Sequence, residues 1–151
     1  MGNPVEPSLT QPLYEALQKE RFAILSTIDH ETGAPCSHAI SWIFAKDENT
    51  VHFAISNRSR ALPNIKKNNL LSITVFANES VYSICGHAEI KTERIEGIPL
   101  KLALVTVKID EVRDIMFYGS ILSVEPVYKK SYDEKAAARL DNQVMEALRK
   151  A

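Results

Sequence analysis

Glycine and cysteine are both scarce in this sequence. The 151 residues include five glycines, at Gly2, Gly33, Gly86, Gly97 and Gly119. Neither the GxGxxG motif of dinucleotide-binding folds nor the GxxxxGK(S/T) motif of P-loop proteins fits that spacing, so both classes of nucleotide site are excluded. The two cysteines, Cys36 and Cys85, form no CxxC pair, which argues against a zinc knuckle or a thioredoxin-like redox motif. We interpret both as buried free thiols.

The four histidines give no sign of a metal centre. His30, His38, His52 and His87 form no HExxH motif and no other close metal-ligand spacing. No serine or cysteine has a recognisable partner for nucleophilic catalysis. We therefore predict neither a metal site nor a hydrolase triad, and the sequence identifies no catalytic acid or base.

The chain also lacks an excess of charge and a long apolar run. Eighteen basic and nineteen acidic side chains give a formal net charge of −1, too little to attract nucleic acid or an anionic membrane. No uncharged apolar run approaches the roughly 20 residues of a membrane span. Residues 1–11 have neither the basic nor the apolar region of a signal peptide. We expect a cytoplasmic protein that binds neither nucleic acid nor a membrane.

What the sequence does contain is a regular series of short strands. Apolar alternation predicts strands over residues 21–29, 36–45, 51–56, 70–77, 81–92, 102–109 and 115–124. Helical spacing predicts short helices over residues 8–20 and 59–68. The charged residues 110–114 between the last two strands are a bulge, a turn or a helical turn, and the sequence does not distinguish among them.

A longer helix closes the chain over residues 133–151. Ser131 followed by Glu134 fits a capping box, and an apolar stripe follows it, formed by Ala137, Leu140, Val144 and Leu148. With 45% apolar and 25% charged residues and no linker, residues 1–151 are predicted to form one domain. The fold class is α+β and mainly β: an antiparallel barrel of about six strands with short helices and a C-terminal helix.

One segment is rich in basic residues and contains no acid. Residues 56–69 carry Arg58, Arg60, Lys66 and Lys67 where a strand leads into a helix. The first-turn amides, the guanidinium groups and the hydroxyls of the two serines in SNRSR can converge there on one phosphate. The alternative is a solvated basic loop, because charged clusters are common on protein surfaces.

Two strands have faces with small side chains. One carries Ala39 and Ser41, and the next carries His52, Ala54 and Ser56. If these strands are neighbours, the two faces form a shelf for a flat ring whose phosphate tail reaches the basic segment. Close packing in a subunit contact is the alternative explanation.

Four pieces of the chain together resemble a known family. They are RFAILSTIDHETGAPCSHAISWIF, VHFAISNRSR, NIKKNNLLSITV and CGHAEI, within residues 21–90. In order and spacing they are similar to the pyridoxamine 5′-phosphate oxidase-related proteins, which are FMN-binding split barrels. The resemblance implies a split barrel and a homodimer with FMN at the subunit interface.

The resemblance also implies a set of cofactor-binding residues. The strand matching His38, Ala39, Ile40 and Ser41 lies along the flavin and its ribityl chain in such proteins, the strand end matching Ala54, Ile55 and Ser56 continues that contact, and the pair matching Ser59 and Arg60 holds the phosphate. Where the family commonly has a lysine after this pair, the chain has Ala61, and Arg58, Lys66 or Lys67 are candidates to compensate; Arg58 is included in the predicted site.

The predicted function is therefore that of an FMN-binding flavoprotein, an oxidoreductase of this family with an unknown substrate. NAD(P)H or another small molecule is the candidate electron donor. The family's vitamin B6 oxidases have a C-terminal Arg-x-His element that this chain lacks, so pyridoxamine 5′-phosphate oxidation is not expected. The alternatives are a non-catalytic flavin carrier or redox sensor, and a cofactor-free β-barrel interaction module.

Overall fold

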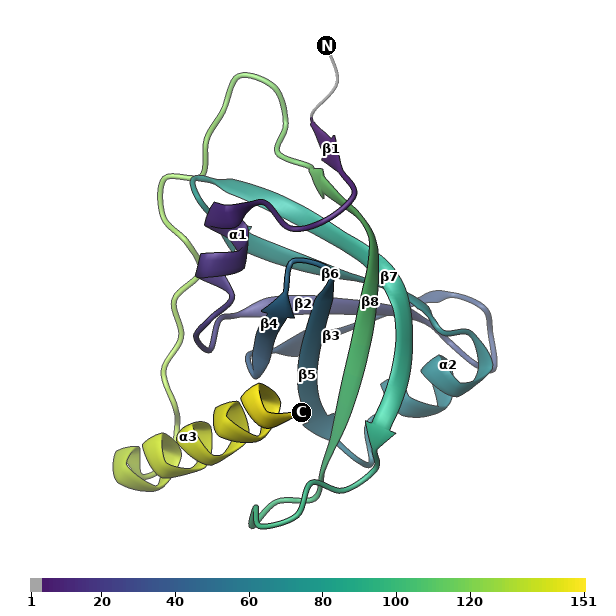
Figure 1. Cartoon of the computed structure of the whole chain (residues 1–151), viewed down its shortest axis with the longest axis vertical. Coiled ribbons are helices and arrows are strands. Elements are labelled where there is room, and N and C mark those ends of the chain that lie inside the picture. The colour runs from purple at the N-terminus through teal and green to yellow at the C-terminus, as the bar shows by residue number, and fades with distance from the viewer. Residues whose placement is uncertain (1–3) are drawn as a thin grey trace.

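The computed structural model describes residues 4–151 (Figure 1). The eight strands are β1 (Val5–Glu6), β2 (Ala23–Ile28), β3 (Pro35–Ile40), β4 (Ile43–Asp47), β5 (Thr50–Ser56), β6 (Leu70–Ala77), β7 (Ser80–Thr92) and β8 (Leu102–Asp114). The three helices are α1 (Gln11–Ala16), α2 (Ala61–Lys67) and α3 (Glu134–Lys150). The predicted α+β class with an antiparallel split barrel and a C-terminal helix is confirmed. None of the helices in residues 4–151 is long and apolar enough to cross a membrane.

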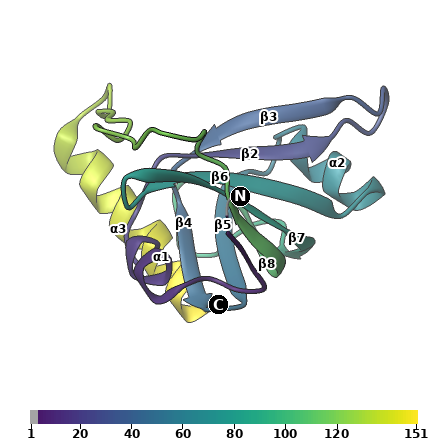
Figure 2. The same ribbon diagram turned by 90° about the horizontal axis from the view of Figure 1, so that it is seen from above.

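All strands belong to one antiparallel sheet. Its order is β3-β2-β6-β7-β8-β5-β4, with β1 added to the far end of β8. The two ends of this order, β3 and β4, are consecutive in the chain, so the sheet curls until its first and last strands are joined by Ser41 and Trp42 (Figure 2). This junction is the split of the barrel.

The alternation within the strands determines which side chains fill the barrel. In β2, Ala23, Leu25 and Thr27 are buried, while the residues between them are half-exposed. In β5 both faces are covered, because Val51 and Phe53 point into the barrel while the opposite face packs under α3. The stripe of α3 predicted from the sequence, including Val144 and Leu148, forms a second core with β5 and β8.

Three strand predictions differ from the structure. The strand predicted over residues 36–45 is two strands, because the backbone turns at Ser41 and Trp42 to leave β2 and join β5. Residues 102–114 form one continuous strand, with a bulge at Asp110 where the register shifts opposite Cys85 and Gly86. The charged residues there are tolerated because one face of this part of β8 is open to solvent.

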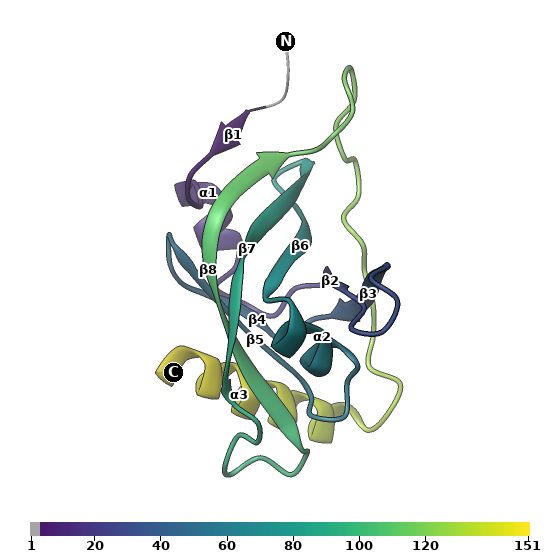
Figure 3. The same ribbon diagram turned by 90° about the vertical axis from the view of Figure 1, so that its right-hand side faces the viewer.

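The third difference is that residues 115–124 form no strand. They belong to an extended segment that runs from the end of β8 to α3 along one side of the barrel (Figures 1 and 3). Ile115 and Leu122 donate backbone hydrogen bonds to the carbonyls of Val81 and Glu79, at 2.8 and 2.7 Å. These two contacts hold the segment without extending the ladder.

The helix limits are also shorter than predicted. α1 ends at Ala16, and α3 begins at Glu134 because Asp133, rather than Ser131, accepts the capping hydrogen bond, from the amide of Ala136. β1 was not predicted, since two residues are too few for a detectable alternation.

Candidate functional site

A pocket lies at the split of the barrel, where β3 ends and the chain bends into β4. Its volume is about 380 Å³. The lining residues come from four segments of the chain: Phe22, Ala39, Ile40, Ser41, Trp42, Ala54, Ile55, Ser56, Tyr128 and Lys130. Six of the ten predicted cofactor-binding residues are thus brought together in one pocket.

Backbone hydrogen bonds place the two central segments side by side. The carbonyl of Ser41 accepts from the amides of Arg21 and Ile43, both at 3.0 Å, which forms the bend between β3 and β4. The carbonyl of Trp42 accepts from the amide of Ala54 at 3.0 Å. These bonds bring the end of β3 next to the end of β5.

The predicted shelf of two paired strands is therefore wrong in one respect. β3 pairs with β2 and β5 pairs with β4 and β8, so β3 and β5 share no ladder within residues 4–151. His52 is 2% exposed, contacts the Leu148 carbonyl of α3 and does not line the pocket, whereas Ala54, also 2% exposed, packs with the core under α3 and lines the pocket. What remains is a pocket between strand ends, because the curl of the sheet brings those ends together.

His38 does not line this pocket. It sits opposite Leu25 in the ladder and is half-buried. Its Nδ1 atom is buried and has no hydrogen-bond partner among the residues that the structure describes. The predicted contact of His38 with the cofactor stays a prediction.

The outer wall of the pocket was not predicted from the sequence. Tyr128 and Lys130 belong to the segment between β8 and α3, and Lys130 forms ion pairs with Glu20 at 2.9 Å and with Asp141 at 3.1 Å. No motif marks these positions, since residues 125–132 were predicted as neither helix nor strand. Only the path of the chain along the barrel brings them to Trp42.

The turn after β5 forms a second part of the site. The amide of Arg58 donates to Ser56 Oγ at 3.3 Å, and the amide of Ala61 donates to Ser59 Oγ at 3.1 Å. Both hydroxyls keep their own proton to donate outward. Ser56 lines the pocket and also stabilises this turn, so the two parts of the site meet at its side chain.

Residues 56–69 contain no acid, yet acidic side chains reach Arg60 from the β2–β3 hairpin. Arg60 Nε donates to Asp29 Oδ1 at 2.5 Å and Nη2 donates to Asp29 Oδ2 at 3.2 Å. Glu31 lies 3.4 Å from the same Nη2. The expected positive patch is therefore partly neutralised. Nη1 of Arg60 and the guanidinium of Arg58 form no ion pair with any residue from 4 to 151.

The pairing shifts the titration of both groups. The hydrogen bond from Arg60 holds the pKa of Asp29 well below its usual range, helped by the amide of Thr32. The same hydrogen bond raises the pKa of Arg60 above its ordinary value. The Thr32 hydroxyl also donates to Asp29 Oδ2 at 3.1 Å, so the carboxylate is held in position by its own hairpin as well as by Arg60.

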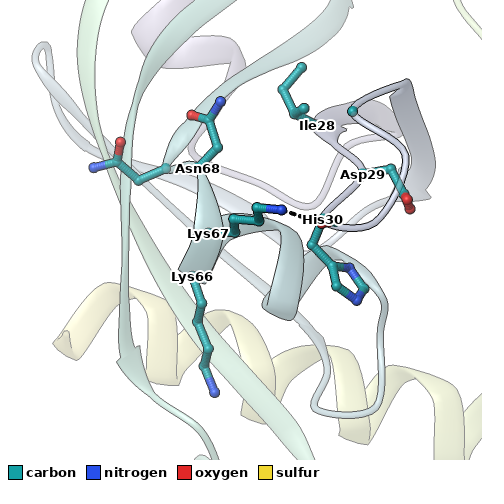
Figure 4. A pocket seen from close by; sticks show the side chains of 8 residues that line it. Ile28, Asp29, His30, Lys66, Lys67 and Asn68 are labelled. Atoms are coloured by element: carbon teal, nitrogen blue, oxygen red, sulfur yellow. Dashed lines mark hydrogen bonds between the residues drawn. The ribbon is translucent and has the colours of Figure 1, made fainter.

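The lysines named as candidates to compensate for Ala61 lie elsewhere. Lys66 and Lys67 are at the C-terminal end of α2, where Lys66 pairs with Glu93 and Lys67 donates to the His30 carbonyl at 2.8 Å. They line a different cavity of about 510 Å³ beside the hairpin, and the two side chains point in different directions in it (Figure 4). Of the three candidates, Arg58 is the one near Ser59.

Comparison with known protein families matches the part of the chain that forms the barrel. The family model described as pyridoxamine 5′-phosphate oxidase matches residues 9–114, more than half of the sequence. The chain belongs to this family. The match includes β2 to β8 and α2, and it ends before Tyr128, Lys130 and α3, so this family member completes its pocket with residues outside the matched region.

Solved structures share the fold of this family member. A putative pyridoxamine 5′-phosphate oxidase from Lactobacillus delbrueckii is 19% identical, with a TM-score of 0.60 over 74% of this chain and 98% of that chain. HupZ from Group A Streptococcus is 17% identical, with a TM-score of 0.60 over 77% and 99%. An F420 reductase is 14% identical, with a TM-score of 0.58 over 69% and 98%. No curated protein matches the sequence.

Proposed function

We propose that this protein binds FMN, with the ring system in the pocket beside Ala39 and the phosphate at the turn of Ser59 and Arg60. The observation that carries the proposal is the continuity of the two parts through Ser56. An apolar pocket and a set of phosphate donors, joined at one residue, match a flat ring with an anionic tail. FMN supplies electron transfer at its ring, and the protein supplies position and electrostatics.

The side chains in the pocket fit a planar ring. Ala39, Ser41, Ala54 and Ser56 are small, so the ring can approach the backbone of both strand ends. Phe22 and Trp42 provide aromatic walls. Burial of apolar surface against these groups stabilises the bound ring by roughly 25 cal/mol per Å².

The turn fits a phosphate through a limited set of donors. Ser59 can donate its hydroxyl, Arg58 is exposed, and Arg60 keeps Nη1 available while Asp29 accepts from its other two nitrogens. Charge-assisted hydrogen bonds from guanidinium groups to phosphate are among the stronger ones in proteins. Arg58 is the cation of this turn that Asp29 and Glu31 leave unpaired, and its charge favours a phosphate there.

We further propose a homodimer formed through the outer face of β2, β3 and β6. This face carries half-exposed apolar and small side chains, including Ile24 opposite Ala39 and, at its edge, Leu70, which is 49% exposed. Such a face suits an isologous contact between two copies. The family resemblance, with FMN at the subunit interface, points the same way.

Reconstitution tests the cofactor directly. The purified chain is mixed with FMN, riboflavin or F420 and passed through a desalting column, and its absorption spectrum and melting temperature are recorded. At 100 times the Kd, FMN should add roughly 2.7 kcal/mol of stability, a rise of roughly 5 to 10 °C in melting temperature for a chain of this size. A protein that retains no flavin and shows no shift with FMN contradicts the proposal; a shift with F420 alone redirects it to that ligand.

Turnover separates an oxidoreductase from a carrier or a redox sensor. The flavin-loaded protein is mixed with NADH or NADPH, and nicotinamide oxidation is followed in air and with added acceptors. Steady consumption that requires bound flavin supports an enzyme. A bound flavin that no reductant turns over supports a carrier or sensor.

A further inference from the structure

A cluster of charged and aromatic side chains lies against the outer wall of the pocket. Its centre is the ammonium of Lys130, which contacts Glu20 Oε2 at 2.9 Å and Asp141 Oδ1 at 3.1 Å. It also lies 5.5 Å from the ring centre of Trp42 and 5.6 Å from that of Tyr128. Three segments that are distant in sequence thus meet at one cation.

The carboxylates of the cluster are fixed by neutral donors as well. Ser41 Oγ donates to Glu20 Oε2 at 2.7 Å, and Trp42 Nε1 donates to Asp141 Oδ1 at 2.8 Å. Because both donors belong to the bend between β3 and β4, the ammonium is held in a defined position relative to the pocket floor. Preorganised groups of this kind recognise a ligand without paying to order a side chain.

The ammonium remains charged and retains one donor. Burial acts to lower the pKa of Lys130, but the hydrogen bonds to Glu20 and Asp141 outweigh it and raise the pKa above its ordinary value. An ammonium has three N–H donors, and the described residues take two of them. Lys130 is 24% exposed in its side chain and lines the pocket, so the third donor is accessible to a ligand there.

We propose that Lys130 is a specificity-determining residue, which donates its third N–H to an acceptor atom of the planar ring bound beside Ala39. The inference rests on the proposed function. It adds a residue outside the matched range 9–114. The ligand class is a flat heteroaromatic ring with a carbonyl oxygen or ring nitrogen at its edge, as in the flavins.

Lys130→Met tests the role, with Lys129→Met as the matched control because Lys129 is the adjacent, exposed lysine outside the pocket. Dissociation constants of FMN and riboflavin are measured by flavin fluorescence, together with the absorption spectrum and reduction potential of the bound flavin. Lys130→Met should weaken both ligands by the same factor, about tenfold for one hydrogen bond to a charged group. The bound flavin should show a shifted spectrum and a more negative potential, because a cation beside the ring favours its reduced form.

The competing explanation is that Lys130 only fastens the C-terminal segment to the barrel. In that case Lys130→Met lowers the melting temperature of the apoprotein but leaves the flavin affinity, spectrum and potential at wild-type values, and the proposal is overturned. If Lys130→Met does not fold, Lys130→Arg keeps the ion pairs and changes only the donor geometry. It should fold, shift the spectrum and weaken both ligands, and an unchanged spectrum and affinity overturn the proposal.

Failure of this inference is distinguishable from failure of the proposed function. If the wild-type protein binds no flavin, both the proposed function and the role of Lys130 are contradicted. A wild-type protein that binds FMN, beside a Lys130→Met variant that binds it equally well with the same spectrum, removes the role of Lys130 alone.

Discussion

The pocket beside Ala39 and the turn at Ser59 are neighbours, but different parts of the chain hold them in place. The pocket is walled by Trp42, Tyr128 and Lys130, and therefore depends on the segment before α3. The turn is held by Asp29 from the β2–β3 hairpin and lies within the family match. The difference is that the turn lies wholly within the family match, whereas the pocket combines residues inside the match with Tyr128 and Lys130 beyond it.

Removing the Arg60 guanidinium should distinguish phosphate binding at the turn from ring binding in the pocket, and it is the largest effect expected. Arg60→Ala is expected to weaken FMN by about 100-fold, the loss of one or two charge-assisted hydrogen bonds, and to leave riboflavin within about twofold. Isothermal titration with both ligands measures the ratio. Arg139→Ala, at an exposed position of α3, is the control and should change neither. Equal losses for FMN and riboflavin would place the phosphate elsewhere.

Asp29 tests whether the turn is positioned by the hairpin. Asp29→Asn removes the charge that orients Arg60, so FMN should bind about tenfold more weakly. Riboflavin should be unaffected. Glu31→Gln is the matched control, because Glu31 contacts the same guanidinium at 3.4 Å but is exposed, and its effect should be small.

The direction of the change in FMN affinity caused by Asp29→Asn decides between two roles of the carboxylate. Tighter FMN binding by Asp29→Asn would mean that the carboxylate competes with the phosphate for Arg60 and does not position it. A parallel measurement of the melting temperature without ligand separates either effect from a general loss of stability.

The smallest expected effect concerns α3, which covers β5 behind the pocket. His52 is 2% exposed and its Nδ1 donates to the carbonyl of Leu148 at 3.0 Å. Burial lowers the pKa of His52 below its ordinary value of 6.5, with Lys91 and Lys46 acting in the same direction against the Leu148 carbonyl and Asp47. The unfolded chain therefore takes up the proton more readily than the folded one.

The resulting stability is complete above pH 6.5 and is lost as the pH falls below it. The melting temperature of the wild type should decrease more than that of His52→Gln between pH 7.5 and pH 5.5, because the glutamine amide can donate to Leu148 without titrating. Parallel decreases in the two proteins would exclude His52 as the source.

Much of the barrel is predictable from the sequence because local alternation reports burial on one face. The strands that became β2, β6 and β7 were predicted with limits within a few residues of those observed. The break at Ser41 and Trp42 was not, since both halves of the predicted strand keep the same alternation and differ only in which strand they pair with. Residues 115–124 have the apolar content of a strand but no available edge that they pair with.

Some residues of the candidate site could be predicted from the sequence, and others are known only from the structure. SNRSR and the small residues of the two strand ends could be recognised from residue type and spacing, and the structure brings Ala39–Ser41 and Ala54–Ser56 into one pocket. The contact of Asp29 with Arg60 joins residues 31 positions apart, and those of Lys130 with Glu20 and Asp141 join residues 110 and 11 positions apart. No local pattern relates these residues.

By itself, then, the sequence determined the α+β class, the positions of most strands along the chain and the basic turn after β5. These features depend on periodicity and residue type, which are local. Tertiary structure alone decided that the turn is partly neutralised by Asp29 and that the pocket is completed by Tyr128 and Lys130. Such contacts arise when the sheet curls and the C-terminal segment runs back along it, and a pattern that repeats every two or four residues carries no information about that path.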